Sequence, residues 1–94
     1  MYARIATWRI AAEDYAALDR EVAPVVAEIK AQPGYVAGYQ LRAAADTVMT
    51  VTLWEDEASM EAAFAAAAPK LAPLAQAGRM ERLDVQSYPA EEWA

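Results

Sequence analysis

Hydrophobic residues recur along this chain with two different periods, and the periods divide it into six segments. Residues 2–10 and 47–54 are rich in aromatic and β-branched side chains, which favour extended strands. Residues 35–42 and 80–88 alternate well enough between apolar and polar side chains to predict two more strands. Because only residues 43–46 separate the second strand from the third, these two strands are expected to form an antiparallel hairpin.

Apolar side chains at steps of three and four residues predict two amphipathic helices between these strands. The first is expected to open at residues 11–14, where Glu13 and Asp14 suit the positive end of a helix dipole. Its apolar stripe begins at Tyr15 and continues for about five turns. Pro24 lies within this helix and predicts a kink or a break there, and Gly34 follows its end.

The second helix is expected to begin near Asp56, with Asp56 or Ser59 as its N-cap residue, and to end at Gly78. Pro69 and Pro73 both fall in its second half. Since proline lacks the backbone N–H that a helix needs, we expect two helical pieces rather than one straight rod.

The resulting order, β-α-β-β-α-β, predicts one α+β domain over residues 1–94, with a ferredoxin-like fold. Its four-stranded antiparallel sheet would carry both helices on one face. A sheet covered on one face normally alternates apolar and polar residues. The third strand instead carries bulk on both faces, with Met49, Val51 and Leu53 on one and Val48, Thr50, Thr52 and Trp54 on the other. We therefore expect a second copy of the chain to cover the free face in a homodimer. The alternative is that these side chains lie on a solvent-exposed surface.

Composition narrows the chemistry that this domain can perform. The formal net charge is −6 and the eight Lys and Arg residues are scattered singly, which argues against a nucleic-acid surface. The chain has no cysteine and no histidine, which removes thiolate nucleophiles, Cys-ligated metal sites and the commonest general base. No apolar run reaches the ~18 residues of a membrane helix, so we expect a cytoplasmic protein without a membrane partner.

Three stretches of the chain resemble the antibiotic biosynthesis monooxygenase branch of the dimeric α/β-barrel superfamily. They are QPGYVAGY at 32–39, VTLWED at 51–56 leading into MEAAF at 60–64, and the last strand with its terminal Tyr88. The resemblance implies a pocket between the sheet and the helices of each protomer. It also implies a reaction without flavin, haem or metal cofactor, in which a deprotonated hydroxyaromatic substrate passes an electron to dioxygen.

Trp54 matches the tryptophan of this family, and two nearby positions depart from the family's pattern. Four residues before it, Thr50 stands where the oxygenases carry an asparagine, and the chain contains no asparagine at all. Six residues after it, Met60 stands where they carry a tyrosine. Thr50 still offers a hydroxyl that can donate one hydrogen bond to an oxyanion. The related haem-degrading enzymes use a histidine as iron ligand, so the lack of histidine excludes that branch.

The candidate site residues are aromatic, hydroxyl or basic side chains on the predicted strands. Two of them, Trp54 and Thr50, are expected to act at the reacting atoms. The other four are expected to bind the substrate: Trp8, Tyr39, Arg42 and Tyr88. Each also has a structural interpretation, because aromatic residues dominate small cores. Tyr88, for example, either donates its phenol into the pocket or caps the sheet.

Arg4 and Arg42 lie on predicted strands, where a guanidinium facing an apolar cavity needs an anionic partner. That partner is either a ligand enolate or carboxylate, or an acidic residue of the last strand, Asp84 or Glu81. We favour the salt bridge for both arginines.

Two functions follow from these observations. The first is a cofactor-independent monooxygenase that oxidises a hydroxyaromatic or polyketide-like small molecule with dioxygen. The second is a non-catalytic homodimer of the same fold that binds small aromatic or lipophilic ligands or serves as a pathway accessory protein. The missing asparagine, tyrosine and histidine suggest the second, and the family resemblance leads us to favour the first.

Overall fold

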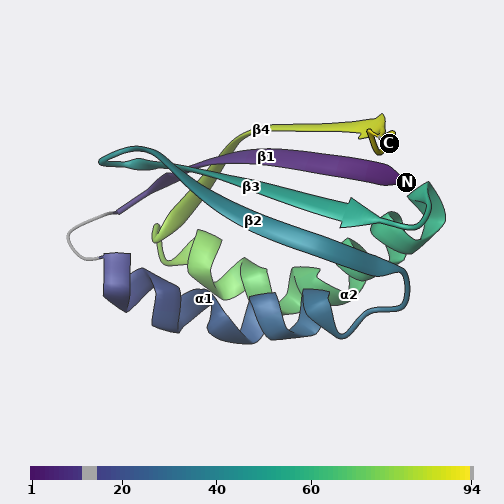
Figure 1. The fold of residues 1–94 in the computed structure, drawn as a ribbon. Helices are drawn as coiled ribbons and strands as arrows, with labels where there is room; N and C mark the ends of the chain where they lie inside the picture. The colour runs from purple at the N-terminus through teal and green to yellow at the C-terminus, as the bar shows by residue number, and fades with distance from the viewer. Residues whose placement is uncertain (12–14, 94) are drawn as a thin grey trace.

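A four-stranded antiparallel sheet forms one layer of the molecule and two helices form the other (Figure 1). The computed structural model describes residues 1–11 and 15–93. Along the chain the elements are β1 (Tyr2–Ile10), α1 (Tyr15–Lys30), β2 (Tyr35–Ala44), β3 (Thr47–Trp54), α2 (Glu57–Gln76) and β4 (Met80–Pro89). The predicted order and the ferredoxin-like fold are confirmed. The prediction that Glu13 and Asp14 open the first helix concerns residues outside the described part.

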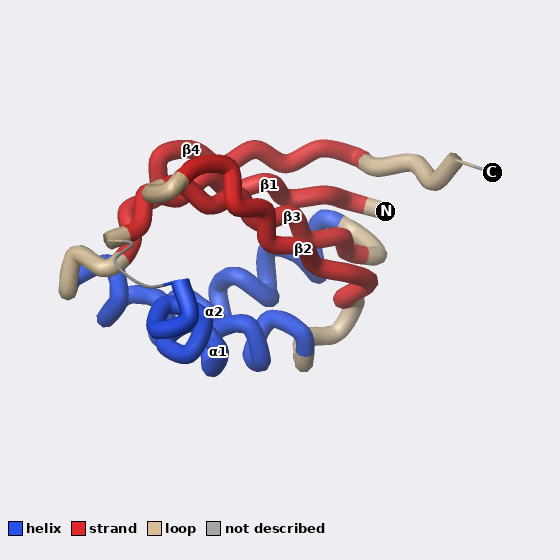
Figure 2. Tube along the Cα trace, turned by 60° about the vertical axis from the view of Figure 1, so that its left-hand side comes forward, coloured by secondary structure: helices blue, strands red, loops and turns tan. Residues whose placement is uncertain are grey.

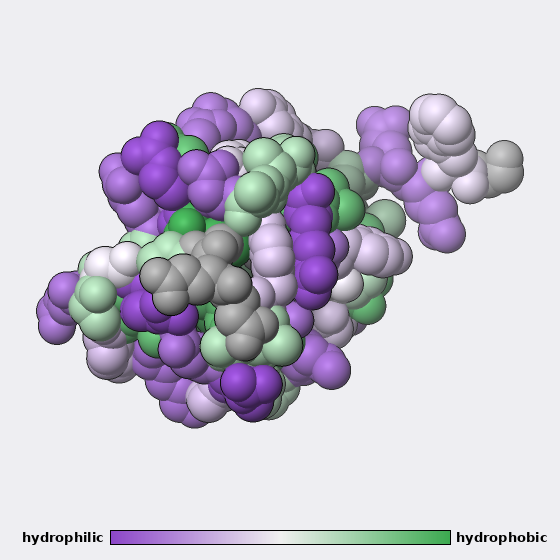
Figure 3. Space-filling view, turned by 90° about the vertical axis from the view of Figure 1, so that its left-hand side faces the viewer, coloured by the Kyte–Doolittle hydropathy of each residue, from purple (hydrophilic) through white to green (hydrophobic). Residues whose placement is uncertain are grey.

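The order of strands across the sheet is β2-β3-β1-β4, so β1 and β3 are central and β2 and β4 are the edges. Both helices cover the same face of this sheet (Figure 2). The end of β4 lies beside the start of β1, where the backbone N–H of Ala90 donates to the carbonyl of Met1 at 2.8 Å. Seen from the end that carries the β2–β3 turn, hydrophobic side chains are visible between hydrophilic groups of the two layers (Figure 3).

The core lies between the helices and one face of the two central strands. Its buried side chains come from alternate positions of β1 and β3 and from one face of each helix: Ala6, Trp8, Ile10, Val48 and Trp54, with Leu18, Val25, Met60, Ala63 and Ala67. The opposite face of the central strands carries Ile5, Met49, Val51 and Leu53, which are only half-buried because no helix covers them. The prediction of bulk on both faces of the third strand is confirmed.

Strand β2 contains an irregularity that changes the face of the sheet to which its first side chain points. Simple alternation places Tyr35 on the same face as Ala37, Tyr39 and Leu41. The ladder shifts between Tyr35 and Ala37, however, so that Tyr35 is opposite Trp54 while Ala37 is opposite Leu53. Because the extra residue turns the strand by one position, Tyr35 faces the helices and Tyr39 faces away from them.

Both helices continue through their prolines. Helix α1 spans Tyr15–Lys30 with Pro24 inside it, and α2 spans Glu57–Gln76 with Pro69 and Pro73 inside it. The prediction of two pieces for the second helix is therefore wrong. Each proline removes one backbone hydrogen bond and crowds a carbonyl of the preceding turn, but Pro69 and Pro73 lie one turn apart on the exposed side, away from the core. The alanine-rich sequence around them favours the helix strongly enough to tolerate that loss.

Asp56 caps the start of α2, as the sequence predicted. Its side chain accepts a hydrogen bond from the backbone N–H of Ser59 at 2.7 Å. This bond stabilises the charged carboxylate and holds the pKa of Asp56 below its usual value of 3.8. Because the folded pKa is lower than the unfolded one, the cap's contribution is complete above the unfolded pKa and is lost as the pH falls through the folded pKa.

We expect Asp56→Ala to be less stable than the wild type at pH 7, and we expect this deficit to shrink as the pH falls towards 2, because acid progressively protonates the wild-type cap. Asp56→Asn is the matched control, because its amide oxygen accepts the same hydrogen bond and does not titrate. Urea denaturation of the three proteins at both pH values measures the effect. A deficit of Asp56→Ala that is equal at pH 2 and pH 7 would contradict this account of the cap.

Candidate functional site

A cavity of about 420 Å³ lies between the helix-facing side of the sheet and the two helices. Its volume falls within the ~300–1,000 Å³ of typical small-molecule sites. The sheet supplies Arg4, Trp8, Thr50 and Thr52 to its walls, and the helices supply mainly apolar side chains, among them Leu18, Val22, Ile29, Phe64 and Leu71. A cavity with apolar walls and a few polar groups suits a flat, mostly apolar ligand.

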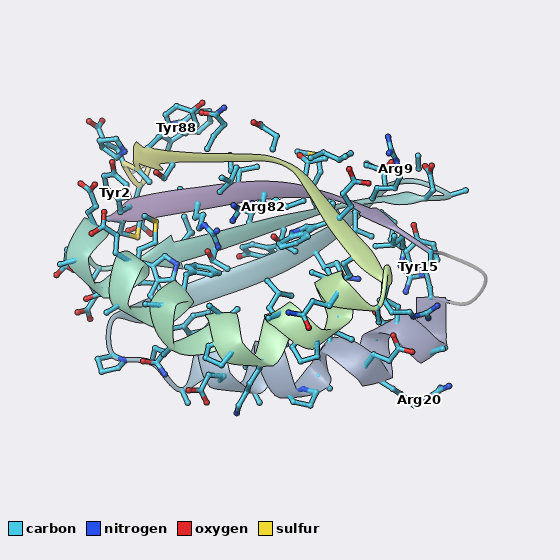
Figure 4. All side chains as sticks on the ribbon, turned by 180° about the vertical axis from the view of Figure 1, so that it is seen from behind. Tyr2, Arg9, Tyr15, Arg20, Arg82 and Tyr88 are labelled. Atoms are coloured by element: carbon cyan, nitrogen blue, oxygen red, sulfur yellow. The ribbon has the colours of Figure 1, made fainter. Side chains whose placement is uncertain are left out.

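Three basic residues line this cavity, namely Arg4, Lys30 and Arg82. Among the described lining residues there is no aspartate and no glutamate. Arg82 lies on β4 on the side between the sheet and α2 (Figure 4). The cavity is therefore positively charged inside a chain whose formal net charge is −6.

Arg4 crosses the cavity from β1 towards α2. Its guanidinium carbon lies 3.6 Å from the centre of the Phe64 ring, a cation–π contact. Burial, with a smaller contribution from the nearby positive charge of Arg82, lowers the pKa of Arg4 to about 10. Over residues 1–11 and 15–93 the Arg4 side chain makes no ion pair and no hydrogen bond, so its donors face the cavity.

The favoured salt bridge from Arg4 to Asp84 or Glu81 is wrong. Arg4 shares its face of the sheet with Ala6 and Trp8, which point to the helices. Asp84 is opposite Thr7 and Glu81 is opposite Arg9, so both acids point to the other face. Glu81 pairs with Arg9 there, at 3.5 Å.

Arg42 does form a salt bridge, but with a different acid from those predicted. Its guanidinium pairs with Asp19 of α1 at 3.3 Å and lies over the ring of Tyr15 at 4.4 Å. Asp84 and Glu81 are out of reach because β2 and β4 are opposite edges of the sheet. Arg42 is exposed and does not line the cavity.

Trp8 and Thr50 meet at the floor of the cavity. The indole Nε1 of Trp8 donates to Oγ1 of Thr50 at 3.4 Å. Since this bond uses Thr50 only as an acceptor, the hydroxyl hydrogen of Thr50 is free to donate to a ligand. The structure thus brings together two of the predicted site residues.

Trp54 lies beside the cavity rather than in its wall. It is fully buried, and its Nε1 donates to Oγ1 of Thr52 at 2.9 Å. The rings of Tyr35 and Phe64 contact it edge to face at centroid distances of 5.6 and 5.8 Å. Trp54 therefore reaches the cavity through Phe64, the ring that supports Arg4.

The other two predicted substrate-binding residues lie at or beyond the edge of the cavity. Tyr39 borders the cavity on β2, but its side chain points to the face of the sheet away from the helices and is 60% exposed. Tyr88 lies on the face of the sheet away from the helices, where its hydroxyl donates to Gln86 at 3.4 Å (Figure 4). Within one protomer, Tyr88 cannot reach a ligand in the cavity.

Arg82 and Phe64 were not predicted as site residues. Strict alternation along 80–88 would put Arg82 on the same face as Asp84 and Tyr88. The β1–β4 ladder shifts after Thr7, so that Arg82 is opposite Trp8 and points towards the helices. No feature of the sequence alone marks this irregularity, whereas Phe64 could have been found from its place on the apolar stripe of the second helix.

A second, open groove of about 600 Å³ runs between the C-terminal half of α2 and β4. Small side chains line this groove, including Ala68, Ala72 and Ala75, and Arg82 lines both the groove and the cavity. The groove also contains Glu81, which already pairs with Arg9. Its walls offer a ligand fewer unpaired donors than the cavity does.

Over residues 1–11 and 15–93, no three acidic side chains come together in a way that could hold a metal ion. In the same part of the chain, neither helix has the length and apolar character needed to cross a bilayer.

Arg4 is expected to cost stability, because its charge is half-buried and the described residues give it no acidic partner. Replacing Arg4 by Met removes the charge and puts a sulfur–aromatic contact in place of the cation–π contact with Phe64. Solvent screening of a partly exposed group reduces the gain, so we expect Arg4→Met to raise the free energy of unfolding by about 1 kcal/mol at pH 7. Urea denaturation measures it; a loss of stability would contradict an uncompensated charge at this position.

The comparisons with known proteins agree with this architecture. The family model described as antibiotic biosynthesis monooxygenase matches residues 1–72. No curated protein sequence matches the chain significantly. Among solved structures, the cofactor-independent oxygenase SnoaB from Streptomyces nogalater has a TM-score of 0.79 at 17% identity, over 98% of this chain and 94% of that one.

Two other solved structures have the same fold at similarly low identity. HapK from Hahella chejuensis has a TM-score of 0.78 at 17% identity, over 100% of this chain and 98% of that one. A protein of unknown function from Nitrosomonas europaea has a TM-score of 0.74 at 19% identity, over 99% and 94%. At such identities these similarities establish the fold.

Proposed function

The chain belongs to the antibiotic biosynthesis monooxygenase family, and we propose on that basis that its cavity binds a hydroxyaromatic molecule and promotes its oxidation by dioxygen. The reaction would need no flavin, haem or metal. The observation that carries this proposal is the cavity itself, which combines apolar walls with a half-buried arginine whose donors are unpaired among the described residues.

The positive charges would make the substrate's own anion the reactive species. A positive charge about 4 Å from an oxyanion is worth about 4 kcal/mol at an effective dielectric constant of about 20. That energy lowers the pKa of a phenol or enol by about 3 units. Because no carboxylate of the described residues lines the cavity to act as a base, we propose that the substrate loses its proton to water as it binds near Arg4 and Arg82.

The bound carbanion then transfers one electron to dioxygen, which gives a substrate radical and superoxide. These two combine into a peroxide at the former methylene carbon. The O–O bond breaks with one oxygen retained as a carbonyl, and the other leaves as water with the two methylene hydrogens. The apolar walls would keep bulk water away from the radical pair.

Three residues would position the substrate for this reaction. Trp8 would support its ring, and the hydroxyl of Thr50 would donate to its oxyanion. Tyr39 borders the cavity on β2, but its side chain faces away from the helices and would not contact the substrate. Trp54 would act as a positioning residue, because it holds Phe64 in place under Arg4.

Oxygen uptake by EDTA-treated protein with an anthrone-type hydroxyaromatic in air-saturated buffer tests this function. We expect a rate above the buffer blank and one dioxygen consumed per carbonyl formed. Thr50→Val should lower the rate about tenfold to a hundredfold by removing an oxyanion donor. Thr50→Ser keeps the hydroxyl and serves as the matched control. A rate equal to the blank would exclude the enzyme, and an unchanged Thr50→Val rate would exclude this role of Thr50.

One observation favours the alternative of a non-catalytic binding protein. Met60 stands at the position where the oxygenases of the family carry a tyrosine. It is buried in the core with Trp54 and Ala63. It does not line the cavity and offers no polar group to a substrate. Saturable ligand binding without oxygen uptake would be the result that supports this second function.

We further propose that two copies of the chain pair through the uncovered face of the sheet. Ile5, Met49, Val51 and Leu53 form an apolar strip on the central strands. Leu41, on the neighbouring edge strand, is 47% exposed and extends this strip. An uncovered apolar face of this kind is typical of protein–protein interfaces, and a two-fold axis would let each copy cover the other.

A further inference from the structure

The charge inside the cavity is opposite to the charge of the whole chain. Fourteen acidic residues against eight basic ones give the formal net charge of −6. The cavity wall nevertheless contains Arg4, Lys30 and Arg82 and, among the described residues, no acid. A positive cavity in an acidic protein attracts anions to a place where most of the surface repels them.

The two arginines offer more than a diffuse charge. The guanidinium carbon of Arg4 lies over the Phe64 ring, which holds the group in place while its donors stay unpaired over the described residues. Arg82 contributes a second guanidinium close enough to lower the pKa of Arg4 by repulsion. Neither side chain forms a salt bridge to residues 1–11 or 15–93.

We propose that Arg4 and Arg82 together form a carboxylate-binding site, so that the molecule this cavity takes is an aromatic hydroxy acid rather than a neutral phenol. The inference rests on the proposed function for the identity of the cavity as substrate site. A planar carboxylate matches the guanidinium fork, which it can engage through two parallel hydrogen bonds. An anion between the arginines would also relieve their mutual repulsion, which a neutral ligand cannot do.

The shape of the cavity selects among anions. A volume of about 420 Å³ with walls from Trp8, Phe64 and the apolar side of α1 accommodates a fused aromatic ring. A small inorganic anion would leave those apolar walls in contact with water, whereas an aromatic acid fills the cavity and pairs with the arginines at once. A bicyclic hydroxy acid is therefore the probe that fits best.

Calorimetric titration at pH 7 with 3-hydroxy-2-naphthoate and with 3-hydroxy-2-naphthamide tests the proposal. The two probes share ring and hydroxyl and differ in charge. We expect the acid to bind at least about tenfold more tightly than the amide, as charge-assisted hydrogen bonds are worth more than neutral ones. Higher salt should weaken binding of the acid and leave the amide nearly unchanged.

Variants of the two arginines test which side chains cause the tighter binding of the acid. Arg4→Gln should weaken binding of the acid roughly tenfold to a hundredfold, and the more exposed Arg82→Gln roughly threefold to tenfold. Arg20→Gln is the matched control, because Arg20 is exposed on α1 and points away from the sheet (Figure 4). It removes the same charge from the chain and should change binding of the acid less than twofold.

Equal binding of acid and amide by the wild type would overturn the proposal, as would the absence of binding by both probes. An acid preference that survives both Arg4→Gln and Arg82→Gln would overturn it too. If Arg4→Gln does not fold, Arg82→Gln alone decides, since Arg82 is exposed and outside the core. Failure of the proposed oxidation would look different: the acid would bind selectively and no dioxygen would be consumed.

Discussion

Replacing Trp54 by alanine is expected to lower the free energy of unfolding by about 3–5 kcal/mol. Trp54 is the largest side chain that is fully buried, and it contacts Tyr35 and Phe64 edge to face. Its removal would open a void at the junction of β2, β3 and α2 and leave Oγ1 of Thr52 without its indole donor. A domain of this size is stable by only about 5–15 kcal/mol, so the variant would lose a large share of its stability.

Urea denaturation followed by circular dichroism measures this loss. Trp93→Ala is the matched control, because Trp93 is 97% exposed near the C-terminus and its removal should change stability by less than about 0.5 kcal/mol. Trp54→Phe should fall between the two, since it keeps an aromatic ring but not the indole hydrogen bond. Equal stability of Trp54→Ala and Trp93→Ala would show that Trp54 does not hold the core together.

Replacing Val51 by glutamate is expected to separate the proposed dimer into monomers. Val51 lies on the central strand β3, on the face that no helix covers. A two-fold axis through that face would bring two glutamates close together, and an unpaired buried charge costs about 3–5 kcal/mol. The dimer dissociation constant should therefore rise by at least about a hundredfold.

Sedimentation velocity at micromolar concentration measures the change. The wild type should sediment as a particle of about twice the chain mass of 10.2 kDa, and Val51→Glu as a single chain. Ala27→Glu is the matched control, because it adds the same charge on the exposed side of α1 and should remain dimeric. A folded wild-type monomer under these conditions would contradict the dimer, as would a Val51→Glu protein that stays dimeric.

The elements of the fold could be predicted from the sequence because their signals are local. The bounds of β1 and β3 agree with the prediction, and the cap at Asp56 follows from one side chain and the backbone three residues on. The continuity of α2 could not be predicted from its prolines alone. Both prolines fall on the exposed side of the helix, and the alanine-rich sequence before them favours the helix despite the cost of each proline.

The facing of side chains near the strand irregularities could not be predicted, because a one-residue shift in a ladder reverses every side chain beyond it. The shift in β2 turns Tyr35 towards Trp54, and the shift between β1 and β4 turns Arg82 towards the helices while Tyr88 faces away. Both irregularities arise from pairing with a neighbouring strand. The sequence of one strand does not contain that information.

For the arginines on the strands, the sequence predicts that an anionic partner is needed, but it does not predict which group that partner is. The sequence indicates that Arg42 needs an acid, but the choice of Asp19 depends on α1 packing beside the edge strand β2. The sequence likewise indicates that Arg4 needs an anion. The structure then shows that the described residues supply none, and this unpaired charge is the main reason to expect an acidic ligand.

A crystal structure of the protein soaked with 3-hydroxy-2-naphthoate would test most directly whether the space between sheet and helices is the ligand site. We predict the naphthalene ring against Trp8 and Phe64, with the carboxylate about 2.7–2.9 Å from the guanidinium nitrogens of Arg4. A ligand found instead in the open groove beside β4 or on the outer face of the sheet, with only water around Arg4, would contradict the account.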